Sequence, residues 1–369
     1  MAESAGGIDI DVPSIREACE AGGYDAFWLR LRTDGDDAAG VTAAAAEADE
    51  AAQEAELDIA AMGVTPCPGG FALELGAAFW DEHVDAWLDH FVRALAGRGI
   101  HGRLEGARDV WLPELLAAAQ PPVPTLFVWF DGVDRPDRYA GWQLPAVATR
   151  EVVGTAVAWV LEQPGPVVLT QFGLSLRAER EGLARELGRI LSGAPSGAVD
   201  LVDDAAWTAR RVAFCPEACG VFQTLGGSAQ DQVDRLRDLA LLLAPHTRLG
   251  FIRVAQRGVS GPHAIDSAQP LAGIEEYHVR RAPALLDRLV PDAHGVQVVG
   301  RAHLAAAGDL PGWRVEELGH DRFLVSAPDL DAWYAGGRPD AAVLARARAD
   351  WDSALLTAAR SDAHAAGED

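Results

Sequence analysis

Histidines and carboxylates near the C-terminal end of the chain form the best candidate for a chemical site. Glu276 and His278 alternate along a predicted strand over residues 274–280, so their side chains share one face. His320 and Asp321 follow in a predicted turn between two short strands. A histidine beside a carboxylate can act as a general acid or base. We therefore weigh a catalytic or ligand site against the alternative of a solvated strand edge with charge pairs.

Three other patterns resemble known sites but lack the required spacing or context. The glycine-rich stretch 97–102 follows a predicted helix and precedes a strand, the reverse of a dinucleotide site, and indicates a helix end and turn. His83 and His90 are about 10.5 Å apart along a helix, too far for one metal ion. Cys215 and Cys219 have no second cysteine pair and are better explained as buried apolar residues. We expect no cofactor and no metal.

The residue types that are missing exclude several classes of enzyme. The sequence contains no lysine and no asparagine, so all 31 basic residues are arginine. Covalent pyridoxal-phosphate enzymes, ordinary P-loop NTPases and ordinary protein kinases all need a lysine and are excluded. No G-x-S-x-G, H-E-x-x-H or EF-hand pattern is present, which weakens a hydrolase hypothesis. This composition is typical of a GC-rich genome, such as that of an actinobacterium.

The charge is strongly acidic and unevenly distributed. The net charge is −24, and residues 1–60 carry half of it, with fifteen acidic residues against three arginines. Such a protein repels nucleic acid and anionic membranes but suits a basic protein partner. Five acids lie in an alanine-rich predicted helix over residues 41–57 and are the candidate binding residues: Glu47, Asp49, Glu50, Glu54 and Glu56. The alternative is a helix with a solvated acidic face.

Three features that the sequence lacks predict where in the cell the protein is found. The N-terminal stretch has neither the basic nor the apolar region of a signal peptide, and no apolar run is long enough to cross a bilayer. Four cysteines in 369 residues do not make a secreted disulfide scaffold. We expect a cytoplasmic protein that binds neither membranes nor nucleic acid.

Hydrophobic patterns predict strands and helices in alternation. The first part reads as strand 24–32, helix 41–57, broken strand 64–75, helix 81–95 and strand 100–105. After the proline-rich joint 120–124 come strand 125–130, helix 147–163, strand 166–176, helix 178–191, strand 198–202, a hairpin or bulged strand at 211–225, a helix capped by Ser228 and strand 249–255. The sequence VTPCPGGFALEL at 64–75 resembles AFCPEACGVFQTL at 213–225, and each precedes a helix and a strand. A duplication would explain this, and chance similarity in alanine-rich sequence is the alternative.

These elements predict an α+β fold with two plait-like (ferredoxin-like) β-α-β units and a small C-terminal α+β unit. The expected boundaries are 1–120, 121–260 and 261–360, with a disordered tail at 361–369. The leading functional hypothesis is a non-enzymatic interaction protein, of the immunity or regulatory type, that binds another protein through an acidic surface. The alternative is a cofactor-independent enzyme or small-molecule binder with a site between the second and C-terminal units.

Overall fold

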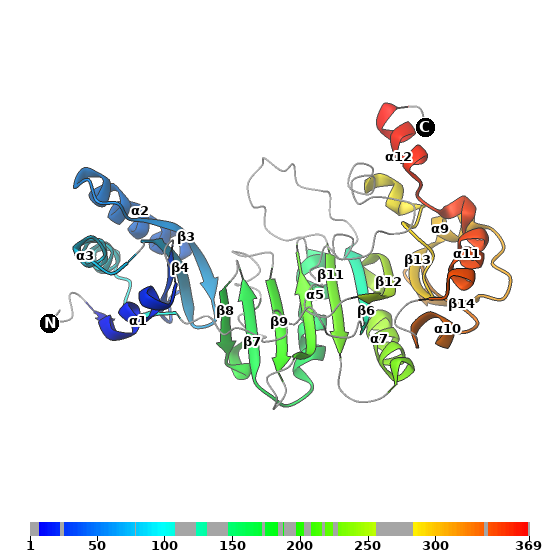
Figure 1. Cartoon of the computed structure of the whole chain (residues 1–369), viewed down its shortest axis with the longest axis horizontal. Helices are drawn as coiled ribbons and strands as arrows, with labels where there is room; N and C mark the ends of the chain where they lie inside the picture. Colours follow the sequence, from blue (N-terminus) through cyan, green and yellow to red (C-terminus); the bar gives the residue numbers. More distant parts are fainter. Residues whose placement is uncertain are drawn as a thin grey trace. The chain divides into compact units, whose positions relative to one another are not determined.

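The computed structural model describes residues 7–22, 26–77, 79–107, 123–130, 147–171, 174–183, 187, 197–202, 208–215, 218–223, 228–255, 283–335 and 339–367. It has a mixed α+β fold with two separate sheets, as the sequence predicts at that level (Figure 1). The chain divides into two compact units. The first contains residues 1–110 and 171–194, and the second contains residues 111–170 and 195–369.

A five-stranded sheet forms the centre of the first unit, in the order β1-β5-β2-β4-β3. β1 and β5 are parallel, and the other neighbouring strands are antiparallel. The elements of this unit follow the chain as β1 (Ile8–Ile10), α1 (Val12–Gly22), β2 (Phe27–Arg32), α2 (Ala38–Glu54), β3 (Ala60–Cys67), β4 (Gly70–Gly76), α3 (Glu82–Gly97) and β5 (Gly102–Gly106).

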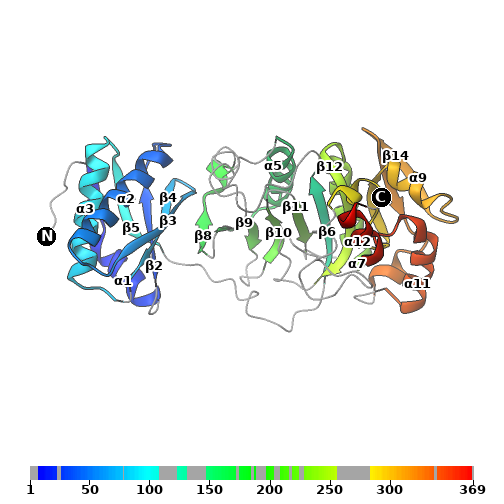
Figure 2. The ribbon, with the colours of Figure 1, turned by 90° about the horizontal axis from the view of Figure 1, so that it is seen from above.

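Helices α2 and α3 contact each other and pack with the sheet around one hydrophobic core (Figure 2). The buried face of α2 is almost all alanine, which lets the helix lie close to its neighbours: Val41, Ala44, Ala45, Ala48 and Ala52. α3 contributes larger groups, with Trp87 and Phe91 fully buried and their ring centroids 4.9 Å apart. The N-cap of α3 is Asp81, whose carboxylate accepts hydrogen bonds from two backbone N–H groups of the first turn.

A ten-stranded sheet has the order β14-β15-β13-β12-β6-β11-β10-β9-β7-β8. The elements up to its middle strands are β6 (Val123–Phe130), α5 (Val147–Leu161), β7 (Val167–Gln171), β8 (Leu174–Ala178), β9 (Gly197–Val202), β10 (Thr208–Phe214), β11 (Ala218–Gln223), α7 (Ala229–Leu243) and β12 (Thr247–Ala255). α5 and α7 contact each other, and both contact β6 and β11. Ser228 caps α7 through a capping box with Asp231, which confirms the predicted helix start.

Part of each unit has the same order of helices and strands. In the first unit the chain order is β2-α2-β3-β4-α3-β5, and the strands lie in the sheet as β5-β2-β4-β3. In the second unit the chain order, apart from the extra strands named below, is β6-α5-β10-β11-α7-β12, and the strands lie in the sheet as β12-β6-β11-β10. All these neighbouring strands are antiparallel in both sheets. The sequence repeat falls on corresponding hairpins, because Cys67 ends β3 and Cys215 directly follows β10. β7, β8 and β9 are extra strands between α5 and β10.

The C-terminal segment joins the ten-stranded sheet, because β13 pairs with both β12 and β15. Its elements are the short 3₁₀ helix η2 (Pro283–Asp287), β13 (Val296–Gly300), α9 (Arg301–Ala307), β14 (Arg314–Gly319), β15 (Arg322–Ser326), α10 (Asp331–Tyr334), α11 (Ala341–Asp350), the 3₁₀ helix η3 (Asp352–Ala354) and α12 (Ala358–Ala366). α12 includes most of the tail that the sequence suggested would be disordered. Thr357 caps its start, and Gly367, in the left-handed conformation, ends it.

Several elements differ from the sequence predictions. The single strand expected over 166–176 is two strands, β7 and β8. β1, α1 and α9 were not predicted. The strand expected over 274–280 lies outside the described residues. Among the helices that the structure describes, none is both long and apolar enough to span a membrane.

Candidate functional site

Four of the five predicted binding residues form one exposed acidic surface along α2 and just beyond it. Glu47, Glu50 and Glu54 lie on the helix face opposite its buried alanines. Glu56 follows the helix end in the left-handed conformation, with φ 57°, and is also exposed. Glu47 pairs with Arg98 at 2.8 Å, and the other three form no ion pair with the residues that the structure describes. We call these four residues the acidic surface of α2.

Asp49 has a different role from the other four acids. Its carboxylate accepts a hydrogen bond from the indole N–H of Trp87 at 2.8 Å and another from the backbone N–H of Ala61 at 2.9 Å. It therefore connects α2 to α3 and β3. Sequence reasoning placed Asp49 among the exposed acids, because a partner 38 positions away is not visible in a local pattern.

A groove of about 650 Å³ runs beside the acidic surface, between the second half of α2 and the start of β3. We call it the α2–β3 groove. The residues that line it are Asp49, Glu50, Gln53, Leu57, Asp58, Ile59, Ala60, Met62, Gly76 and Ala77. It thus combines apolar walls with three carboxylates, and none of the described residues that line it is an arginine.

Two large apolar side chains in this part of the first unit are strongly exposed, and one of them, Met62, lines the groove. Met62 is 70% exposed, and Phe79, two positions beyond Ala77, is 66% exposed. Met62 lies in an irregularity of β3, where the pairing with β4 shifts between Ala61 and Gly63. A β-bulge of this kind redirects side chains and ends regular pairing. No sequence periodicity predicted these two residues as surface groups.

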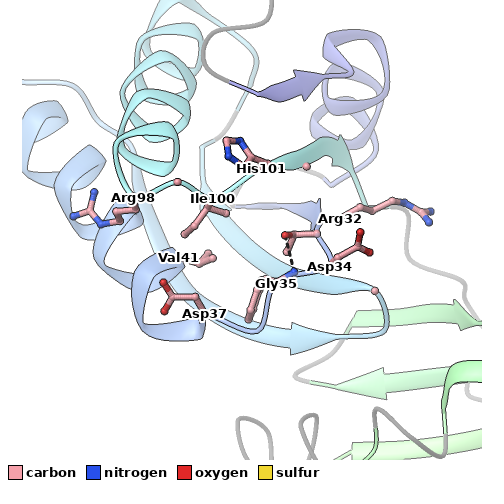
Figure 3. Close-up of a pocket in the computed structure, with 13 residues that line it drawn as sticks. Arg32, Asp34, Gly35, Asp37, Val41, Arg98, Ile100 and His101 are labelled. Carbon is pink, nitrogen blue, oxygen red and sulfur yellow. Dashed lines mark hydrogen bonds between the residues drawn. The ribbon is translucent and has the colours of Figure 1, made fainter.

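A second hollow, of about 690 Å³, lies where β2, the start of α2 and the α3–β5 connection meet (Figure 3). Its lining includes three buried apolar side chains, Val41, Phe71 and Ile100. Figure 3 shows the side chains of Arg32 and Arg98 extending to opposite sides, and each has an acidic partner elsewhere, Glu105 and Glu47. Because its charged groups do not converge, this hollow is the weaker candidate.

The glycines near this hollow have a structural role. Gly102 has φ +155°, and a Cβ there would lie 2.0 Å from the carbonyl oxygen of Arg32. The stretch 97–102 thus ends α3 and starts β5, as its context in the sequence predicted. The feature is a close approach of two strands, which requires glycine.

The C-terminal candidates can be placed only in part. His320 and Asp321 form the turn of the β14–β15 hairpin, with φ values of 52° and 59° that fit a type I′ turn. Both are exposed, and Asp321 pairs with Arg301 at 2.8 Å. Glu276 and His278 lie outside the described residues. The predicted cluster of four therefore stays a prediction.

The second unit contains buried polar groups that the sequence did not single out. His294 is 6% exposed and stacks on Phe251, with ring centroids 4.1 Å apart and planes 5° from parallel. Among the described residues, its Nε2 has no hydrogen-bond partner, and neither amide atom of the fully buried Gln297 has one. Gln297 pairs with Phe251 across β12 and β13, so both groups lie around the same ring.

Electrostatics near this cluster favour neutral histidine. Burial lowers the pKa of His294 to about 3, and the arginines Arg253 and Arg348 add to the effect against the opposing influence of Asp292. Asp292 forms a two-pronged pair with Arg348, with both N–O distances 2.8 Å, and raises the pKa of that guanidinium. Burial also lowers the pKa of His303, to about 4.

His303 is a structural residue. Its Nδ1 accepts a hydrogen bond from the backbone N–H of Gly300 at 3.1 Å, which places the ring proton on Nε2 facing the carbonyl oxygen of Leu286 at 2.9 Å. All four cysteines are buried, and none forms a disulfide with another described residue; burial raises the pKa of Cys219 to about 12. Within the described ranges, no group of three or more His, Cys, Asp or Glu side chains is arranged to hold a metal ion.

No protein-family model, curated protein or solved structure matches this chain. Function must therefore be argued from the acidic surface of α2, the α2–β3 groove and the buried polar cluster of the second unit.

Proposed function

We propose that this protein is a cytoplasmic, non-enzymatic interaction protein, of the immunity or regulatory type, that binds a basic protein through the acidic surface of α2. The observation that carries this proposal is the position of the acids. Glu50, Glu54 and Glu56 are exposed and form no hydrogen bond or ion pair with the described residues. Exposed charges of one sign mainly increase the association rate of an oppositely charged partner.

The corresponding helix of the second unit supports a specific role for these acids. α2 carries four acidic residues and no basic one, whereas α5 carries one of each. α5 occupies the same place in the order of elements, so the fold itself does not require an acidic helix there. The acids therefore call for an explanation beyond a solvated helix face.

We also propose that each unit contains one ferredoxin-like plait and that the two plaits arose by duplication. The support is the shared β-α-β-β-α-β order, the shared strand order and the antiparallel pairing of all these strands. The position of Cys67 and Cys215 on corresponding hairpins adds to it. In this interpretation, the acidic helix distinguishes the first copy from the second.

The experiment is a comparison of association kinetics. A partner is captured with the full chain from native lysate and purified, and its association rate is measured at two ionic strengths. Replacing Glu47, Glu50, Glu54 and Glu56 by Gln should slow association and reduce its salt dependence. A control with four exposed second-unit acids neutralised should behave like the unmodified chain: Asp234, Asp238, Asp309 and Glu317. Equal rates for both variants would contradict the proposal.

Asp49 is left unchanged in this variant. Its two hydrogen bonds hold α2 to α3 and β3, so its replacement would disturb the fold as well as the charge. Glutamine has nearly the helix propensity of glutamate, so α2 should remain folded in the variant. Equal thermal midpoints of the variant and the unmodified chain are the control for folding.

The buried polar cluster supports a second candidate function, the binding of a small molecule in the second unit. Buried polar atoms without partners cost about 1–3 kcal/mol each, and a bound molecule could satisfy those of His294 and Gln297. Without a ligand, Gln297→Leu should raise the thermal midpoint, because it removes two such atoms at similar volume. A lowered midpoint would show that the amide has partners in the folded chain and would remove the basis for this candidate.

A further inference from the structure

The chemistry of the α2–β3 groove indicates what kind of segment it could bind. Asp49 already accepts two hydrogen bonds, so Glu50 and Asp58 are the carboxylates of the groove that remain available. Neither forms a hydrogen bond or ion pair with the described residues, and both are exposed. A guanidinium or ammonium group is the natural complement of two such carboxylates.

The apolar side of the groove is an independent observation. Four large hydrophobic side chains are strongly exposed in the described part of the chain, and one of them, Met62, lines the groove. Leu57 and Ile59 line the groove beside Met62. Exposed apolar groups that gather beside a polar rim are typical of protein-binding sites. Methionine is also common at surfaces that adapt to a partner.

The edge of the sheet at β3 is poorly suited to accept another strand. β3 is the last strand in the order, but Pro66 lacks an N–H, and the pairing shifts between Ala61 and Gly63. The backbone N–H of Ala61 is already bonded to Asp49. Recognition here must therefore depend on side chains and not on extension of the sheet.

We propose that the α2–β3 groove binds a segment of a partner protein in which an arginine or lysine is next to an aliphatic or aromatic side chain. The apolar side chain covers Met62, and the cation lies at Glu50 and Asp58. This inference rests on the proposed function and makes it specific, since it names the anchoring residues and the chemistry of the partner.

The test uses the full chain and a random library of twelve-residue peptides as the probe. Peptides selected on the immobilised chain should be enriched in arginine or lysine beside an apolar residue. In fluorescence anisotropy, Met62→Asp should weaken their binding at least tenfold, and Met62→Leu should retain it. Glu50→Gln with Asp58→Asn should weaken it at least fivefold. The matched control is Leu242→Asp, which alters a similarly exposed apolar residue of the second unit, at 62%, and should have no effect.

The outcomes separate this inference from the proposed function. One outcome is that basic peptides lose affinity when Glu47, Glu54 and Glu56 are neutralised but keep it in Met62→Asp. This would contradict binding in the groove and leave the acidic surface of α2 as the binding site. If the selected peptides lack basic residues, or bind all variants equally, both the groove proposal and the proposed function would be contradicted. Because Met62 is 70% exposed, Met62→Asp should fold normally, and an unchanged thermal midpoint would verify this.

Discussion

The two buried histidines of the second unit should make it sensitive to acid. The pKa of His294 is about 3 and that of His303 about 4 in the folded chain, because burial disfavours the charged ring. An unfolded histidine titrates near 6.5. Below that pH the unfolded chain binds more protons than the folded chain, so the free energy of unfolding falls as the pH falls.

The size of this effect follows from the difference in pKa. Between pH 7.5 and pH 5.0, each histidine lowers the free energy of unfolding by about 2 kcal/mol, since one pKa unit corresponds to about 1.4 kcal/mol. Together they remove about 4 kcal/mol, a large part of the 5–15 kcal/mol that stabilises a typical domain. His294→Phe keeps an aromatic ring against Phe251 but cannot titrate, so it should reduce the loss by about 2 kcal/mol.

Urea unfolding of the full chain at both pH values measures this loss. The curves are fitted with one transition for each unit, because two units need not unfold together. His320→Asn is the control, since His320 is exposed in a hairpin turn and asparagine tolerates its positive φ. If His294→Phe and the unmodified chain lost the same stability on acidification, the assignment of His294 as a buried neutral group would be wrong.

Three further predictions concern the carboxylate bridge, nucleic acid and the cysteines. Asp49→Ala should destabilise the first unit by about 2 kcal/mol in urea unfolding, because it leaves the buried indole N–H of Trp87 without a partner. Glu50→Ala is the control and should change stability by less than about 0.5 kcal/mol. Duplex DNA should not bind at physiological salt, since the net charge is −24, and micromolar binding with a steep salt dependence would contradict this. The purified protein should contain no stoichiometric zinc and four free thiols, and elemental analysis and thiol counting without reductant would detect a zinc ion or a Cys215–Cys219 bridge.

Elements with strong local signals were predicted well. α3 has an N-cap at Asp81 and a stripe of large apolar side chains at helical spacing, and the structure has the helix at Glu82–Gly97. The turn expected at His320 and Asp321 between two short strands is also confirmed, and its glycine and aspartate residues favour such a turn. The faint repeat at Cys67 and Cys215 correctly marked two hairpins with the same place in the order of elements.

Features that depend on distant residues could not be predicted. Asp49 looks like its exposed neighbours in sequence, and Trp87, on another helix, makes it structural. Met62 is exposed at a position where the pairing of β3 with β4 shifts, and no hydrophobic pattern encodes such a shift. His294 and Gln297 have buried polar atoms without a hydrogen-bond partner among the described residues, and only the packed structure reveals this.

Hydrogen exchange of the complex with the captured partner tests the central claim most directly. If the acidic surface of α2 and the α2–β3 groove form the interface, amides of residues 50–63 should exchange more slowly in the complex than in the free chain. Amides of β13 (Val296–Gly300), in the second unit, should exchange equally in both. Slower exchange confined to the second unit, with residues 50–63 unchanged, would contradict the account.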